Sequence, residues 1–118
     1  MKLYLPGMRL ESLLNVRWHW AKRAAYSKVK RATTRLELAA RFVPINMMWP
    51  VQVTIVRIAP RSFDSDNLAA ACKPVRDGVA DWLGCDDGDM VKVAFFYEQR
   101  KGGAGEYSVE IRIGEDSA

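Results

Sequence analysis

The order of three stretches in the middle of the chain constrains the fold most. Residues 51–58 (VQVTIVRI) are rich in β-branched side chains, which is typical of a central strand covered on both faces. Residues 67–83 form a helix-length run that ends before Gly84, a common helix stop. Residues 90–98 (MVKVAFFYE) are again strand-like. A strand, a helix and a second strand in this order indicate an α/β domain.

The flanking segments extend this order to β-α-β-α-β-β with a mixed sheet. Residues 2–5 predict a short strand ended by the turn signal Pro6-Gly7, and residues 8–17 predict a loop. Residues 106–113 alternate between apolar and polar side chains, as a strand with one wet face does. The 118 residues suffice for one core, so we expect a single domain, 1–118, whose tail at 114–118 frays.

Residues 18–43 predict a long helix that ends at Pro44. Apolar side chains recur along it at steps of three and four, at Trp18, Ala21, Ala25, Val29, Ala32, Leu36, Ala39 and Val43. This stripe predicts the face that packs against the rest of the protein. The basic residues lie mainly off the stripe and are expected to face solvent or a partner.

Charge is distributed unevenly along the chain. Residues 17–41 carry eight Lys or Arg against one Glu, whereas residues 64–89 carry seven Asp against one Lys and one Arg. One basic element beside one acidic element suits a protein that holds a polyanion while coordinating a cation near it.

Aspartates lie at both ends of the run 67–83. Asp64 and Asp66 precede it, and Asp86, Asp87 and Asp89 follow it. We expect the helix to bring both groups to the same edge of the sheet, where crowded carboxylates need a cation to neutralise them. Oxygen ligands without a His or Cys cluster favour Mg²⁺ or Mn²⁺, which activates bound water for attack on a phosphoryl group.

Lys73 follows Asp66 by seven positions, about two helical turns, so both face the same way in an unbroken helix. A lysine there could offset charge on a scissile phosphate, or pair with Asp77 four positions later. Pro74 predicts a kink or two abutting helical segments. Simpler interpretations stay open: Asp66 as a helix N-cap, the acidic group after Gly84 as a solvated turn, and Lys73 as a surface lysine.

The motif Asp64-Ser65-Asp66-Asn67-Leu68, the helix with Lys73 and Asp77, and then Gly84-Cys85-Asp86-Asp87 together resemble the RusA family of Holliday-junction resolvases. The likeness extends to the Pro6-Gly7 strand end, the segment 15–20 before the basic helix, and the hairpin at Lys101-Gly102-Gly103.

This resemblance implies a homodimeric, Mg²⁺- or Mn²⁺-dependent endodeoxyribonuclease that cuts four-way DNA junctions by paired symmetric nicks. It maps the family's acidic ligands onto Asp64, Asp66 and Asp87, with Asp86 as a further candidate, and its catalytic lysine onto Lys73. The family places that lysine four positions after the second aspartate, whereas the spacing here is seven. Three extra residues turn a helix by about 300°, so the lysine can keep its face.

Basic residues are the candidate DNA contacts under this interpretation. They are Arg17, Lys22, Arg23, Lys28, Lys30, Arg31, Arg35, Arg61 and Arg76. Two alternatives stay open: a RusA-like phage protein that binds branched DNA without cutting it, and a nuclease of flaps or forks. A protein-interaction module explains the charges less well.

The chain carries no visible secretory signal and no apolar run long enough for a membrane helix, so we expect a cytoplasmic protein of a bacterial or phage-infected cell. Cys72 and Cys85 are expected to be thiols rather than a disulfide. His19 has no visible ligand or nucleophile partner, which indicates a structural role.

Overall fold

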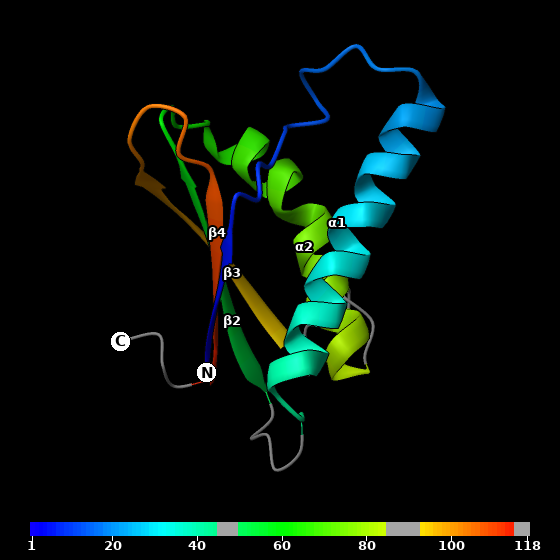
Figure 1. Cartoon of the computed structure of the whole chain (residues 1–118), viewed down its shortest axis with the longest axis vertical. Helices are drawn as coiled ribbons and strands as arrows, with labels where there is room; N and C mark the ends of the chain where they lie inside the picture. The colour runs from blue at the N-terminus through cyan, green and yellow to red at the C-terminus, as the bar shows by residue number, and fades with distance from the viewer. Residues whose placement is uncertain (45–49, 85–92, 115–118) are drawn as a thin grey trace.

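A four-stranded mixed sheet with two helices on one of its faces forms the domain (Figure 1). The computed structural model describes residues 1–44, 50–84 and 93–114. The elements are β1 (Lys2–Pro6), α1 (Trp20–Arg41), β2 (Val51–Ala59), α2 (Ser65–Leu83), β3 (Val93–Lys101) and β4 (Ser108–Ile113). The predicted α/β class, the element order and the mixed sheet are confirmed.

Strand β2 lies inside the sheet, in the strand order β1-β4-β2-β3. It pairs in parallel with β3, with Val51 beside Val93 and Ala59 beside Lys101, and antiparallel with β4. Because β2 and β3 run the same way, α2 is a crossover that returns the chain to the starting end of the sheet. The carboxyl end of β2 and the amino end of β3 therefore lie at opposite ends of the sheet.

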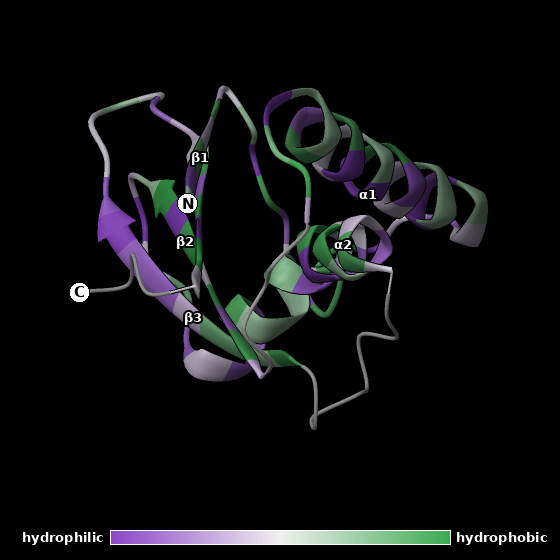
Figure 2. Ribbon diagram, turned by 90° about the horizontal axis from the view of Figure 1, so that it is seen from below, coloured by the Kyte–Doolittle hydropathy of each residue, from purple (hydrophilic) through white to green (hydrophobic). Residues whose placement is uncertain are grey.

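The main core lies between the sheet and α2 (Figure 2). Val53 and Ile55 of β2 and Ile111 of β4 are fully buried, and Val75 and Val79 of α2 cover them. The alternation predicted for residues 106–113 is confirmed, since Val109, Ile111 and Ile113 are all buried. Apolar residues recur at every second position on the strands and at every third or fourth position on α2, and both sets pack into a single core.

The other face of the sheet carries no helix, yet β2 is buried there too. Val56 is only 1% exposed, and its neighbours in the sheet register are Glu98 of β3 and Glu110 of β4. Arg112 pairs with Glu98 at 3.3 Å and with Glu110 at 2.9 Å. The burial of β2 on both faces confirms the prediction of a central covered strand, and on the helix-free face its neighbours are long charged side chains that form ion pairs.

Helix α1 packs through a different face from the one its apolar stripe predicted. Thr34 and Leu38 are fully buried, whereas Val29, Leu36 and Val43 are more than half exposed. Thr34 can be buried because its hydroxyl donates to the Lys30 carbonyl at 2.8 Å.

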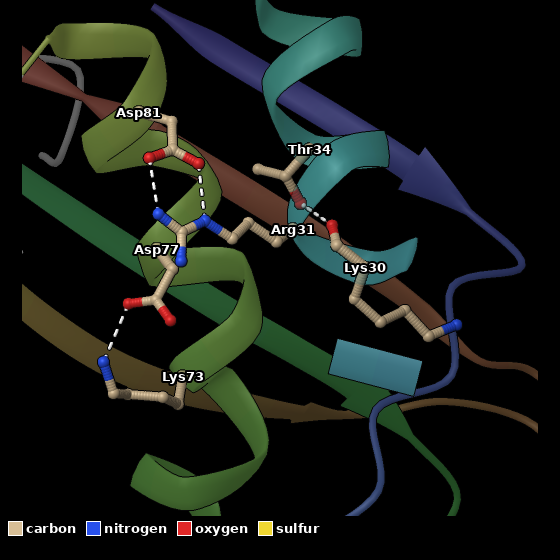
Figure 3. Close-up of polar contacts among 6 residues, drawn as sticks. All are labelled: Lys30, Arg31, Thr34, Lys73, Asp77 and Asp81. Atoms are coloured by element: carbon tan, nitrogen blue, oxygen red, sulfur yellow. Dashed lines mark hydrogen bonds and ion pairs between the residues drawn. The ribbon is translucent and has the colours of Figure 1, made fainter. Parts of the chain in front are cut away.

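Close approach between the two helices decides which face of α1 packs. Gly78 of α2 lies against α1, where an added Cβ would come within 2.6 Å of the Arg31 carbonyl oxygen and 2.7 Å of the Thr34 Cβ. Beside this contact, the Arg31 guanidinium donates twice to the Asp81 carboxylate, at 2.6 and 2.7 Å (Figure 3). Small and polar residues therefore make the α1–α2 contact. The pattern of hydrophobic residues alone thus predicted the wrong packing face of α1.

Helix α2 begins earlier than its sequence predicted and continues past its proline. Asp64, not Asp66, is the N-cap residue, and the helix runs from Ser65 through Pro74 without division into two segments. Gly84 ends the helix with a φ of 76°, as predicted, because the left-handed conformation suits glycine. The buried Cys72 is a free thiol, and burial raises its pKa to about 12.

Neither helix combines the length and the apolar character that crossing a bilayer requires, among the residues that the structure describes.

Candidate functional site

Asp64 lies just beyond the carboxyl end of β2, where a short loop leads into α2. Its Oδ1 accepts hydrogen bonds from the Asn67 backbone N–H at 2.9 Å and from the Asn67 Nδ2 at 3.0 Å. These bonds stabilise the ionised form and lower the pKa of the Asp64 carboxyl below its ordinary value. Asp64 is exposed, so its carboxylate is charged at neutral pH and accessible to a cation.

Asn67 connects this carboxylate to the N-terminal loop. The buried Ser12 donates its hydroxyl to the Asn67 Oδ1, while the amide nitrogen of Asn67 reaches Asp64. Leu68, the next residue, is buried in the core. The motif Asp64-Ser65-Asp66-Asn67-Leu68 therefore combines a cap, a positioning amide and a core anchor.

The loop between β2 and α2 is held at several points. The Gln99 side chain accepts from the Phe63 N–H at 2.9 Å and donates to the Phe63 carbonyl at 2.6 Å. The Arg57 Nη1 donates to the Arg61 carbonyl at 2.7 Å, and the Gly102 N–H donates to the Ala59 carbonyl at 2.9 Å. These bonds fix the direction in which the chain enters Asp64 without using any hydrogen-bonding group of its carboxylate.

Asp66 is exposed in the first turn of α2. Within the described part of the chain, no hydrogen bond reaches an Asp66 carboxylate oxygen, and the Asp66 backbone N–H also helps to lower the pKa of the Asp64 carboxyl. Hard oxygen ligands of this kind suit Mg²⁺ or Mn²⁺, so the two carboxylates fit part of the expected metal shell. No group of three or more metal-ligating side chains occurs in residues 1–44, 50–84 and 93–114.

Lys73 lies further along α2, and its Nζ donates to the Asp77 carboxylate at 2.8 Å (Figure 3). Asp77 lies one turn further towards the carboxyl end of α2, so this contact directs the ammonium away from Asp66. The lysine side chain is 56% exposed, and a solvated pair of this kind contributes little to stability. The pairing with Asp77 was one of the two alternatives that the spacing left open.

Asp86, Asp87 and Asp89 lie outside the described residues. Their flanking residues are nevertheless placed, and they correct one expectation. Gly84 ends α2, and Val93 begins β3 beside Val51, at the end of the sheet opposite to Ala59. Nineteen helical residues span about 28 Å, so α2 separates its two ends rather than bringing them to one sheet edge. The expectation treated β2 and β3 as neighbours but did not consider that they are parallel, so that the end of one and the start of the other lie at opposite ends of the sheet.

The candidate DNA contacts fall into two groups. Arg31 is bound to Asp81, and Arg76 donates to the Tyr97 hydroxyl at 2.8 Å and lies over the Phe95 ring. Both therefore help to hold α1, α2 and β3 together. The remaining candidates are Arg17, Lys22, Arg23, Lys28, Lys30 and Arg35 on or beside α1, and Arg61 in the loop before α2.

The amino ends of α1 and α2 lie at the same end of the molecule as the carboxyl end of β2 (Figure 1). Lys22 and Lys28, both exposed on the first half of α1, thus share that end with Asp64 and Asp66. This end of the domain combines accessible carboxylates with accessible cations.

Arg57 is the residue that sequence analysis missed. It is the only charged side chain in β2, is 5% exposed, and its guanidinium stacks 3.6 Å from the centre of the Phe63 ring. Its register on β2 places it on the face that carries Ile55. The sequence did contain a sign of it, because Arg57 is the one charged residue in the apolar run 51–58. An arginine is rarely buried unless it has a specific partner or role.

The chain is similar to a curated protein of unassigned function. This relative is an uncharacterized protein from Xylella fastidiosa (strain Temecula1), 35% identical over 95 residues that cover 72% of this chain and 59% of the relative. The chain thus spans less than two thirds of that relative's length. No protein-family model matches the sequence.

Proposed function

We propose that this protein is a metal-dependent endodeoxyribonuclease that resolves four-way DNA junctions. The observation that carries the proposal is the pair of exposed carboxylates, Asp64 and Asp66. They lie at the same end of the molecule as the first half of α1, which carries the exposed Lys22 and Lys28. The resemblance of the motif and of its surroundings to the RusA family supports this reaction class over other uses of a metal.

Asp64 and Asp66 would hold Mg²⁺ or Mn²⁺, whereas Asp87, which the resemblance offers as a third ligand, follows the far end of α2 and is not used in this proposal. Such an ion supplies activated water and stabilises charge on the phosphoryl oxygens. The chain's own contribution is orientation, because Asn67 and the loop bonds hold Asp64 in place. Exposed cations on α1 would bind the DNA arms through their phosphates.

The decisive experiment is cleavage of a synthetic four-way junction by the wild type and by Asp66→Asn, with Mg²⁺, Mn²⁺ or EDTA. We expect paired symmetric nicks that require metal and Asp66. Binding in EDTA should be retained or tightened by Asp66→Asn, because one negative charge near the phosphates is removed.

Glu98→Gln is the matched control, since it removes one carboxylate from the helix-free face of the sheet. It should leave cleavage unchanged. Equal loss of binding and cleavage in Asp66→Asn would instead make Asp66 a structural residue and contradict the proposed metal site.

A second candidate function is a protein of the same fold that binds branched DNA without cutting it. Two observations favour it: the Lys73 ammonium contacts Asp77, and α2 separates Asp64 from Gly84. Tight junction binding without any cut, with either metal, would establish this alternative.

A further inference from the structure

A cationic cavity opens beyond the carboxyl ends of β2 and β3. It has a volume of about 570 Å³ and is lined by Arg57, Ala59, Pro60, Arg61, Ser62, Gln99, Arg100 and Lys101. Four of these residues carry positive charge, and the lining includes no aspartate or glutamate. The cavity volume lies within the range that small-ligand sites occupy.

Arg57 makes this more than a cluster of surface cations. Its side chain is buried, yet its Nε has no hydrogen-bond partner and no carboxylate pairs with it among the described residues. Its Nη1 is committed to the Arg61 carbonyl, and the Phe63 ring stacks on the guanidinium. Glu11 acts on this guanidinium electrostatically but forms no ion pair with it. A bound anion would therefore add to the compensation of a buried cation, which is otherwise costly.

The other cations are arranged around this fixed guanidinium. Arg61 lies in the loop that Arg57 and Gln99 hold, and Lys101 lies at the end of β3 opposite Ala59 in the sheet register. Arg61 and Lys101 are both exposed, so an anion could reach them from solvent. Several arginine and lysine donors converging on one cavity suit the oxygens of a phosphate group.

We infer that this cavity binds a phosphate of a nucleic-acid backbone next to the phosphodiester that is held at Asp64 and Asp66. Arg61 and Asp64 are three residues apart in one tethered loop, and three residues span at most about 10 Å, so one strand can reach both the cavity and the two carboxylates. The choice of a backbone phosphate rests on the proposed function. A free phosphate offers the same chemistry and is distinguished below.

The first arm of the test uses inorganic phosphate without metal or DNA. Amide resonances of residues 59, 61–63 and 99–102 should shift and saturate on titration, with chloride at equal ionic strength as the reference. The variant Arg61→Gln/Lys101→Gln should weaken this binding at least about tenfold, since it removes two cations that touch the cavity. It preserves the backbone carbonyl that Arg57 uses.

The matched control is Lys2→Gln/Arg41→Gln. It makes the same change in net charge at the other end of the sheet and of α1 (Figure 1). This variant should bind inorganic phosphate like the wild type. Shifts that do not saturate, that chloride reproduces, or that both variants weaken equally would overturn the assignment of a phosphate site.

The second arm measures four-way junction binding in EDTA. The cavity variant should lose roughly tenfold in affinity relative to the control variant at moderate salt. If the wild type binds inorganic phosphate but the cavity variant binds the junction as tightly as the control variant does, the cavity does not bind a backbone phosphate. It would then be a site for free phosphate. Because both arms exclude metal, absence of cleavage would defeat the proposed nuclease while the cavity result stands.

Discussion

At the scale of single residues, the clearest design is the chain of hydrogen bonds from Ser12 through Asn67 to Asp64. It explains why an asparagine follows the second aspartate, since its amide nitrogen and its carbonyl oxygen serve different partners. The local sequence predicted a capping carboxylate but placed it two residues too late. Cap position depends on where the preceding loop delivers the chain, and here Arg57 of the preceding strand and Gln99 of the more distant β3 fix that loop.

Asn67→Ala should raise the pKa of the Asp64 carboxyl towards its ordinary value. The side-chain bond would be lost while the backbone bond, the larger cause of the lowered pKa, stays. A lowered folded-state pKa stabilises the fold above the unfolded value, and that stabilisation disappears as pH falls through the folded pKa. The variant should therefore lose less stability between neutral and acidic pH than the wild type does.

Carboxyl NMR titration of Asp64, together with urea unfolding at several pH values, would measure both effects. Ser12→Ala is the control, because it removes the hydroxyl but leaves the amide bond to Asp64. An Asp64 pKa that stays the same in Asn67→Ala would show that the backbone bond alone sets it.

At the scale of elements, α2 is held on two sides. Gly78 allows close contact with α1, and Arg76 reaches Phe95 and Tyr97 of β3. Periodicity predicted the existence and extent of both helices well, because it is a local property. It failed for the packing face of α1, where a glycine on the partner helix favours Thr34 over larger apolar residues.

Gly78→Ala should destabilise the domain by about 1–3 kcal/mol. The added methyl would meet the Arg31 carbonyl oxygen and Thr34 at distances that real Cβ atoms do not adopt, so the helices must separate. This outweighs the gain of about 1 kcal/mol that alanine brings inside a helix. Denaturant unfolding would give the difference in free energy.

Gly103→Ala is the comparison variant, because an added Cβ there meets no atom within 4 Å. It should change the free energy of unfolding by no more than about 0.5 kcal/mol. A Gly78→Ala protein as stable as the wild type would mean that the α1–α2 contact can relax without loss.

At the scale of the whole molecule, one end carries Asp64, Asp66, the cationic cavity and the amino ends of both helices. Charge distribution along the sequence predicted a basic element beside an acidic one. It could not predict the cavity, because Lys101 of β3 joins Arg57 and Arg61 only through the parallel β2–β3 pairing. The expectation that both acidic groups lie at one edge of the sheet was wrong for the same reason, because it did not take the parallel direction of β2 and β3 into account.

Affinity for a four-way junction in EDTA should fall steeply with salt, since phosphate contacts release counterions. Replacing Lys22 and Lys28 with Gln should reduce the slope of log K against log salt by about 1.8 if each contacts one phosphate. Fluorescence anisotropy across a salt series would measure the slope. An unchanged slope would remove the first half of α1 from the DNA interface.

The Gly78 contact also links distant parts of the molecule mechanically. Fourteen residues of continuous helix, about 21 Å, separate Gly78 from the Asp64 cap. A rigid rod fixed at that point converts a small tilt into a larger displacement at its end. Natural variation where α1 and α2 cross could thus change the position of the Asp64 carboxylate, and with it the geometry of the proposed metal site, while every residue of that site stays the same.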